Sequence, residues 1–228
     1  MFPVFTDWTF LILIPAMLLA FYAQGKVKAV FEQYFREPNT AGLSGAEAAE
    51  RLIRINHLQD VRVEKTQKGA GDHYDPREKV IRLSPVVYSS TSLTSLGVVA
   101  HEVGHAVQHA EGYVPLALRN TLAPVTGFSS TLAFPFLLLG LLTSLSSLVK
   151  IGILVFLAVA IFQIITLPVE YNASRRALTL LEANGMVKPY EFKAINSVLN
   201  AAALTYVAAA LMAVSNLVML SGFYRNRN

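Results

Sequence analysis

The sequence predicts a mainly α-helical membrane protein that also carries a small α+β domain. Of its 228 residues, 54% are hydrophobic and 15% are charged, whereas soluble domains are usually about 25% charged. A bilayer-spanning helix needs about 20 mostly apolar residues. Four segments meet this requirement: Val4 to Gln24, Leu122 to Val149, Ile151 to Val169 and Val198 to Phe223. Two short segments that alternate apolar and polar residues indicate strands, which add the α+β domain.

The first apolar segment is expected to stay on the chain as a membrane anchor. No Lys or Arg precedes this segment, and no small-residue cleavage site closes it before Lys26. A secretory signal peptide would show both features. The second and third segments follow each other closely and are expected to form a transmembrane hairpin.

The distribution of basic residues predicts the orientation of the spans. Twelve of the 19 Lys and Arg lie in residues 25–121, and four more lie in residues 170–197. Basic residues near span ends favour the cytoplasmic side, so both regions are expected on the cytoplasmic face of the cell membrane. Residues 25–121 also hold 11 acidic residues and no basic run. The charge therefore indicates topology within a lipid bilayer, and no nucleic acid is expected as a partner.

The chain is expected to alternate between membrane segments and two pieces of one α+β domain. The predicted parts are an N-terminal anchor at 1–24, a first domain piece at 25–121, the hairpin at 122–169, a second domain piece at 170–197, and a C-terminal span with its tail at 198–228. No internal repeat or low-complexity tract is present.

The first domain piece is predicted to contain a helix followed by two strands. Ser44 and Glu47 have the spacing of a capping box at a helix start. The segments 61–66 and 79–84 alternate apolar and polar residues, as half-buried strands do. The stretch between them, 69–76, is rich in turn residues and is expected to be a connection without regular structure.

A second helix of this piece carries a metal-binding motif. It is expected to begin after a serine-rich stretch that ends at Ser92 and to stop near Gly112. Inside it lies His101-Glu102-Val103-Gly104-His105, which has the form H-E-x-x-H. Histidines four residues apart share one helix face, so both imidazoles can reach a single metal ion. Glu102 then lies close enough to accept a proton from metal-bound water.

Zinc is the ion that this motif favours. Imidazole and carboxylate ligands with an open fourth position suit zinc, although other divalent metals also bind such sites. Cysteine is absent, which excludes thiolate ligands and disulfides. The alternative interpretation is a solvent-exposed helix face with two solvated histidines. Apolar flanking residues argue against it, because they predict partly buried histidines, and buried polar groups need partners. We expect one zinc ion per chain.

A catalytic zinc site usually has a third protein ligand. His109 lies eight residues after His101, about 12 Å along a straight helix, which is too far for it to share the ion. A supporting or surface position is expected for it. Glu170 returns to the same membrane side after the hairpin and can face the metal from another helix. The alternative is an interfacial carboxylate that pairs with Arg175 or Arg176.

Four stretches of the sequence resemble the YugP-type family of membrane zinc metallopeptidases. They are Asp72-His-Tyr-Asp-Pro, Ile81-Arg-Leu-Ser-Pro, Ala100-His-Glu-Val-Gly-His-Ala-Val-Gln-His and Leu167-Pro-Val-Glu-Tyr-Asn-Ala-Ser-Arg-Arg-Ala-Leu. They occur in matching order, and the resemblance covers most of the chain from about Lys26 to Gly185. The plan is more distantly similar to that of CAAX-prenyl-type and heat-shock-type integral membrane proteases. In those proteins a transmembrane hairpin separates the H-E-x-x-H motif from a glutamate ligand.

The resemblance implies a gluzincin-like catalytic domain in which zinc is bound by His101, His105 and Glu170. It implies Glu102 as the general base of peptide-bond hydrolysis by a zinc-activated water. The implied substrate is a peptide or a membrane protein.

One position departs from the pattern of the distant relatives. They carry an acid four residues after the glutamate ligand, where this chain has Ser174. That acid is expected to support a zinc-bound histidine. Asn172 or Ser174 is expected to take over this role here.

Two further features are expected to contribute to peptide binding and hydrolysis. His73 or Tyr74 is a candidate second electrophile beside the metal for the oxyanion, although both can equally be ordinary turn residues. The strand 79–84 is expected to offer a free edge to an extended peptide, which is also how a purely structural edge strand looks.

Three alternatives to a membrane peptidase with its active site at the membrane surface are less consistent with the sequence. A non-catalytic membrane protein with a structural zinc site is the main alternative, but such a site has no need of Glu102. An intramembrane protease is disfavoured because serines and threonines at 89–95 place the motif at the membrane surface. A metal transporter would carry ionisable residues inside its spans, and the four predicted spans contain no His.

Overall fold

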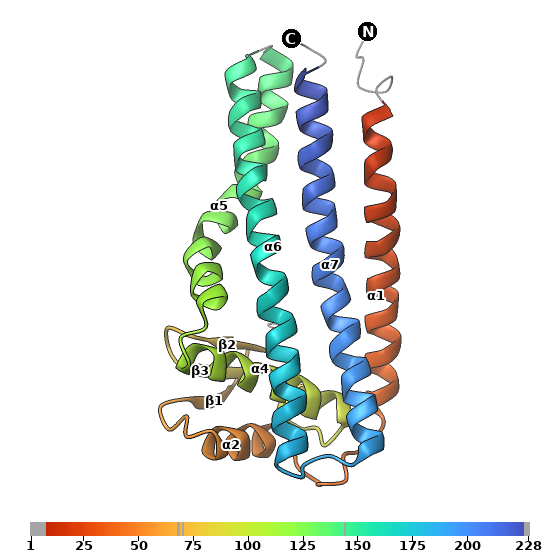
Figure 1. The fold of residues 1–228 in the computed structure, drawn as a ribbon, viewed down its shortest axis with the longest axis vertical. Coiled ribbons are helices and arrows are strands. Elements are labelled where there is room, and N and C mark those ends of the chain that lie inside the picture. The colour runs from red at the N-terminus through yellow and green to blue at the C-terminus, as the bar shows by residue number, and fades with distance from the viewer. Residues whose placement is uncertain (1–7, 68, 70, 144, 226–228) are drawn as a thin grey trace. The chain divides into compact units, whose positions relative to one another are not determined.

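The computed structural model describes residues 8–225, apart from residues 68, 70 and 144. Most of the described residues are helical (Figure 1). The chain divides into two compact units: unit 1 is Met1–Gln24, Ala117–Pro168 and Leu204–Asn228, and unit 2 is Gly25–Leu116 and Val169–Ala203. All candidate site residues predicted from the sequence lie in unit 2.

Four long helices account for most of unit 1, and each continues into unit 2. Their bounds are α1 Leu13–Phe35, α5 Val114–Thr143, α6 Ser146–Ala183 and α7 Pro189–Arg225, and a short 3-10 helix, η2 Trp8–Ile12, precedes α1. Three described segments are long and apolar enough to cross a membrane: Phe10–Phe35, Ser147–Ala183 and Pro189–Gly222. The predicted mainly helical class with a small sheet is confirmed.

The prediction of four membrane spans is wrong for the described residues, which provide three. The predicted span 122–149 does not form one helix, because α5 ends at Thr143 and α6 begins at Ser146. In addition, α5 contains Pro124 and Pro135. A proline inside a helix removes a backbone donor and crowds the preceding turn.

The remaining elements belong to unit 2. They are α2 Gly45–Ile55, β1 Arg62–Lys65, β2 His73–Asp75, β3 Val80–Leu83, α3 Pro85–Ser89 and α4 Leu93–Ala110. Ser44 and Glu47 make both hydrogen bonds of the predicted capping box at α2. Ser92 caps the start of α4, and Gly112 follows the helix with a φ of 66°. That left-handed conformation suits glycine, so the predicted ends of the motif helix are confirmed.

The three strands form one sheet in the order β1-β3-β2. β1 pairs with β3 in parallel, and β2 pairs with β3 antiparallel. β2 occupies the stretch that was expected to lack regular structure. The prediction of a free edge at segment 79–84 is wrong, because β3 lies between the other two strands and both its edges are paired.

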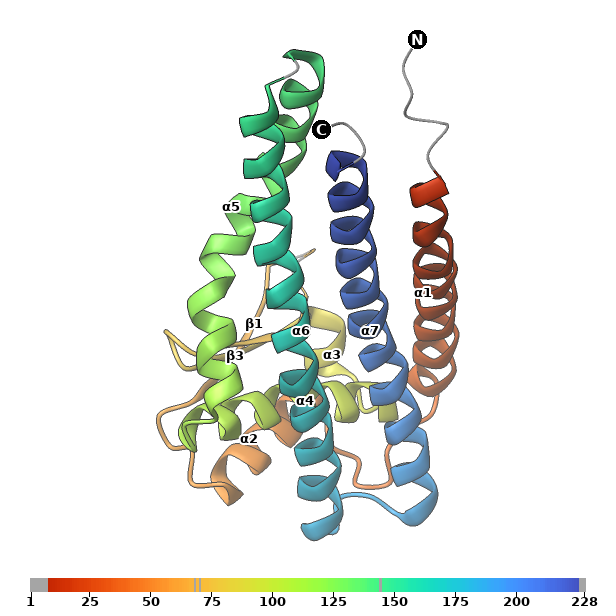
Figure 2. The same cartoon turned by 45° about the horizontal axis from the view of Figure 1, so that its top comes forward.

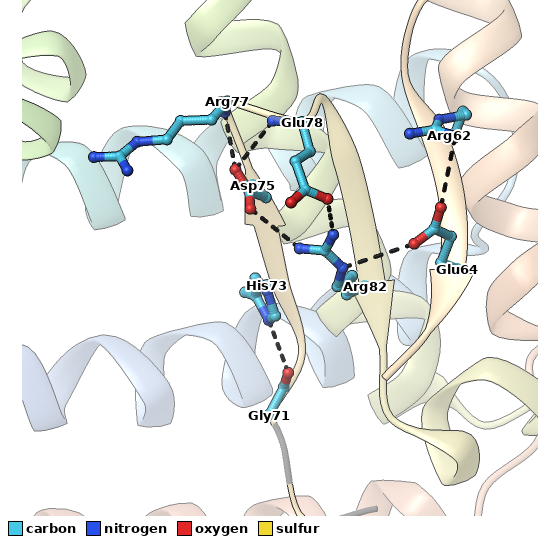
Figure 3. Close-up of polar contacts among 8 residues, drawn as sticks. All are labelled: Arg62, Glu64, Gly71, His73, Asp75, Arg77, Glu78 and Arg82. Carbon is cyan, nitrogen blue, oxygen red and sulfur yellow. Dashed lines mark hydrogen bonds and ion pairs between the residues drawn. The ribbon is translucent and has the colours of Figure 1, made fainter. Parts of the chain in front are cut away.

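Arg82 of β3 connects all three strands on one face of the sheet (Figure 3). Its Nη1 lies 3.1 Å from Asp75 Oδ2 in β2, and its Nε lies 3.7 Å from Glu64 Oε2 in β1. It also contacts Glu78. Asp75 accepts further hydrogen bonds from the backbone N–H groups of Arg77 and Glu78. These contacts hold the short strand β2 beside β3.

Helix α4 lies at the centre of unit 2. It packs against α2 and against strands β2 and β3, and it crosses the C-terminal part of α6 (Figure 2). The core around it is aliphatic and includes Leu52, Ile81, Leu83, Leu93, Leu96, Leu181 and Ile195. Most of α4 is therefore surrounded by protein, and its polar side chains need partners within the fold.

Candidate metal centre

Helix α4 places the motif side chains in a buried environment. His105 is 7% exposed and Glu102 is 8% exposed, while His101 is partly buried. Val103 and Ala106 between and after them are buried in the core. The partial burial expected from the apolar flanks of the motif is confirmed.

Helix α6 brings a glutamate to the two histidines. The predicted third span does not end at residue 169, because α6 continues without a break through Pro168 and Glu170. Glu170 is 1% exposed. Its Oε2 lies 3.1 Å from His101 Nε2 and 3.6 Å from His105 Nε2. A residue remote in sequence is thereby placed against both histidines.

These three side chains fit a divalent metal ion. One candidate ligand atom from each of them lies within 4.8 Å of the others, and no other such group of three His, Cys, Asp or Glu occurs among the described residues. Two imidazoles and a carboxylate are the donor set of many catalytic zinc sites. A buried carboxylate also needs a compensating positive charge, which a metal ion supplies. The residues present therefore suit zinc.

Glu102 lies beside this cluster and faces strand β2. Burial raises the pKa of Glu102, and the charge of His101 and a hydrogen bond from the backbone N–H of Tyr74 act in the opposite direction. The carboxylate is thus largely desolvated yet keeps a donor from β2. Such an environment makes the Glu102 carboxylate a stronger base than a solvated glutamate.

Each histidine of the cluster makes a second contact through its other ring nitrogen. Ser174 Oγ lies 3.1 Å from His101 Nδ1, so Ser174 occupies the supporting position expected for it. Gln108 Oε1 lies 3.0 Å from His105 Nδ1. Asn172 does not replace the acid directly, because its side chain contacts Gln108 and Arg176.

Gln108 is a residue that the sequence interpretation missed. It follows His105 by three residues on the same helix, and this spacing places the two side chains on one face. That spacing was the available signal, but a glutamine in a helix is usually a solvated surface residue.

His109 and the two candidate electrophiles lie on the β2 side of α4. His109 Nδ1 lies 2.9 Å from the hydroxyl of Tyr74, so His109 supports a strand residue. Burial, with Asp60 and Asp75 nearby, raises the pKa of Tyr74 to about 12. His73 is exposed and contacts the carbonyl of Gly71 (Figure 3). A role in oxyanion stabilisation stays a prediction for both.

Comparison with known proteins places the chain in a family. The sequence model of the family described as "Putative neutral zinc metallopeptidase" matches residues 9–225, and the chain belongs to this family. The resemblance seen in the sequence motifs is thereby confirmed.

A curated relative agrees with this assignment. The chain is 45% identical over 213 residues to the "Putative membrane protease YugP" of Bacillus subtilis (strain 168). The match covers 93% of this chain and 95% of the relative. No solved structure matches the chain.

Proposed function

We propose that the protein is an integral membrane zinc metalloendopeptidase that binds one zinc ion through His101, His105 and Glu170. The observation that carries this proposal is the convergence of these three side chains within 4.8 Å beside the buried Glu102. Family membership supports zinc and peptidase activity. The apolar helices and the YugP relative support a membrane location.

Glu102 is the proposed general base. When bound, zinc polarises the scissile carbonyl and lowers the pKa of the attacking water. The Glu102 carboxylate takes a proton from that water and returns it to the leaving amine. Desolvation of Glu102 favours the first step, because burial raises the pKa of this carboxyl group and so makes the carboxylate a stronger base. The proposed substrates are peptides or membrane proteins.

Zinc content and cleavage of an unfolded protein test this proposal together. Glu170→Ala is expected to lose bound zinc and peptidase activity, because it removes one of three ligands. His109→Ala is the matched control, since this residue is on the motif helix but contacts Tyr74. It is expected to retain zinc. Zinc retained by Glu170→Ala and lost by His109→Ala would overturn the ligand assignment. Zinc without cleavage in the wild-type protein would favour the structural alternative.

We further propose that unit 2 lies on the cytoplasmic side of the cell membrane, as the basic residues of 25–121 and 170–197 indicate. The chain has no cysteine, so a single Arg77→Cys reports the location of its own position. The Arg77 side chain is exposed and points away from the strands (Figure 3). A membrane-impermeant maleimide is expected to label this variant only after cells are permeabilised. Labelling in intact cells would contradict this proposal and place residue 77 on the outer side of the membrane.

A further inference from the structure

We propose that Gln108 is a positioning residue that fixes the ring tautomer of His105 and thereby sets the zinc affinity of the site. The orientation of Gln108 is in turn fixed by a hydrogen-bonded chain that runs through Asn172 to Arg176. This inference rests on the proposed metal site. It assigns a role to three residues outside the ligand set.

The surroundings of Gln108 leave its amide only one orientation. Gln108 is 0% exposed, so its polar atoms must be satisfied by protein groups. One end of its amide lies 2.9 Å from the backbone carbonyl of Val169. A carbonyl oxygen only accepts hydrogen bonds, so the Gln108 atom beside it is the amide nitrogen. The amide oxygen then faces His105.

Asn172 imposes the same orientation independently. Its Oδ1 lies 2.7 Å from Nε of Arg176 and 2.9 Å from the Gln108 nitrogen. A guanidinium only donates hydrogen bonds, so Asn172 presents its oxygen to both neighbours. Arg176 is itself held by Glu111, at 2.6 Å between Nη2 and Oε2. The chain of contacts thus starts at an ion pair and ends at His105.

The consequence is a single neutral tautomer of His105. Because the Gln108 oxygen lies 3.0 Å from His105 Nδ1, Nδ1 must carry the proton and donate it. The lone pair of the neutral ring is then on Nε2. Nε2 is the atom that faces Glu170, at 3.6 Å. The tautomer set by Gln108 is therefore the one whose lone pair is available to the metal.

The other histidine lacks such a constraint. His101 Nδ1 contacts the hydroxyl of Ser174 at 3.1 Å, and a hydroxyl both donates and accepts. Ser174 therefore accommodates either tautomer of His101. Of the two histidine ligands, only His105 therefore has its tautomer fixed by its neighbour, Gln108.

Two substitutions of Gln108 separate positioning of His105 from packing. Gln108→Met keeps the approximate volume and removes the acceptor for His105 Nδ1. Gln108→Glu keeps an acceptor oxygen for Nδ1 but places its second oxygen against the acceptors of Val169 and Asn172. Of these two variants, Gln108→Glu is therefore expected to be the less stable, and yet it is expected to bind zinc more tightly than Gln108→Met.

The test measures the zinc dissociation constant by chelator competition and the melting temperature of the zinc-free protein. Gln108→Met is expected to bind zinc about 10- to 100-fold more weakly, which is typical when a group that supports a ligand is lost. Gln108→Glu is expected to recover most of that loss despite a lower melting temperature. A purely packing role predicts that zinc affinity follows melting temperature, and that outcome would overturn the inference. Wild-type protein that binds no zinc would instead refute the proposed metal site.

Ring nitrogen spectra give a second readout that does not depend on activity. The chain has five histidines, and replacing His57, His73 and His109 by glutamine leaves the two ligand rings for long-range proton–nitrogen NMR. The ring whose signals change on Gln108→Glu substitution is His105. We expect its proton on Nδ1 already in the zinc-free protein, because zinc bound at Nε2 would by itself leave the proton on Nδ1. A proton on Nε2 would show that Gln108 does not set the tautomer.

Discussion

Glu102→Gln is expected to lower the turnover of peptide cleavage by about 10²- to 10⁴-fold, the usual contribution of a positioned general base. Glutamine has the same shape but does not accept a proton from water at neutral pH. Glu102 is not a member of the His101, His105 and Glu170 cluster, so zinc binding should persist. The measurement is the rate of cleavage of an unfolded protein by the zinc-loaded variant, with zinc content determined on the same sample.

An exposed glutamate of unit 2 serves as the control for this substitution. Glu50 lies on α2 and is exposed, so Glu50→Gln removes the same charge without touching the cluster. Its cleavage rate is expected to equal that of the wild-type protein. If Glu102→Gln cleaves at the wild-type rate with zinc bound, Glu102 is not the base.

The motif helix and its chemistry were predictable because they depend on local sequence. Ser92 at the start of α4 and Gly112 after its end are short-range signals, and H-E-x-x-H places two histidines on one face by helix geometry alone. Glu170 was harder, since its approach depends on the packing of α6 against α4. Glu170 was predicted from its return to the same membrane side and from the family resemblance. The distances from its carboxylate to His101 and His105 place it against both histidines.

Features that depend on tertiary contacts were not predictable from the pattern. Strand β2 has only three residues and is held by pairing to β3 and by Arg82. No alternation in so short a segment marks it as a strand. Gln108 likewise looks like any surface glutamine of a helix, and its partners Val169 and Asn172 lie more than 60 residues away in sequence. The end of α5 at Thr143 falls inside the predicted span 122–149, whose apolar composition gives no sign that a helix ends there.

Gly104→Ala is expected to disrupt the metal centre although it adds one methyl group to a residue that binds nothing. A Cβ at position 104 would lie 2.6 Å from the backbone oxygen of Ala173 and 3.3 Å from its carbonyl carbon. A contact of this length requires a shift, and the atoms in the way are backbone atoms of α6. Helices α4 and α6 must then separate where α4 holds two proposed ligands and α6 holds the third. We expect zinc affinity to fall and stability to drop by about 1–3 kcal/mol, as in other overpacked cores.

Two variants separate this mechanism from a general effect of adding a methyl group to α4. Gly97 lies in the same helix, and a Cβ there would meet the Ile195 side chain at 3.0 Å. A side chain can change its rotamer, so Gly97→Ala is expected to cost less stability and to leave zinc affinity unchanged.

Removing the side chain of Ala173 should not rescue Gly104→Ala, because the obstructing atom belongs to the backbone. Zinc titration and thermal melting of Gly104→Ala, Gly97→Ala and the Gly104→Ala, Ala173→Gly double variant check these expectations. Restored zinc affinity in the double variant would contradict backbone contact as the cause and indicate that the Ala173 methyl group opposes residue 104.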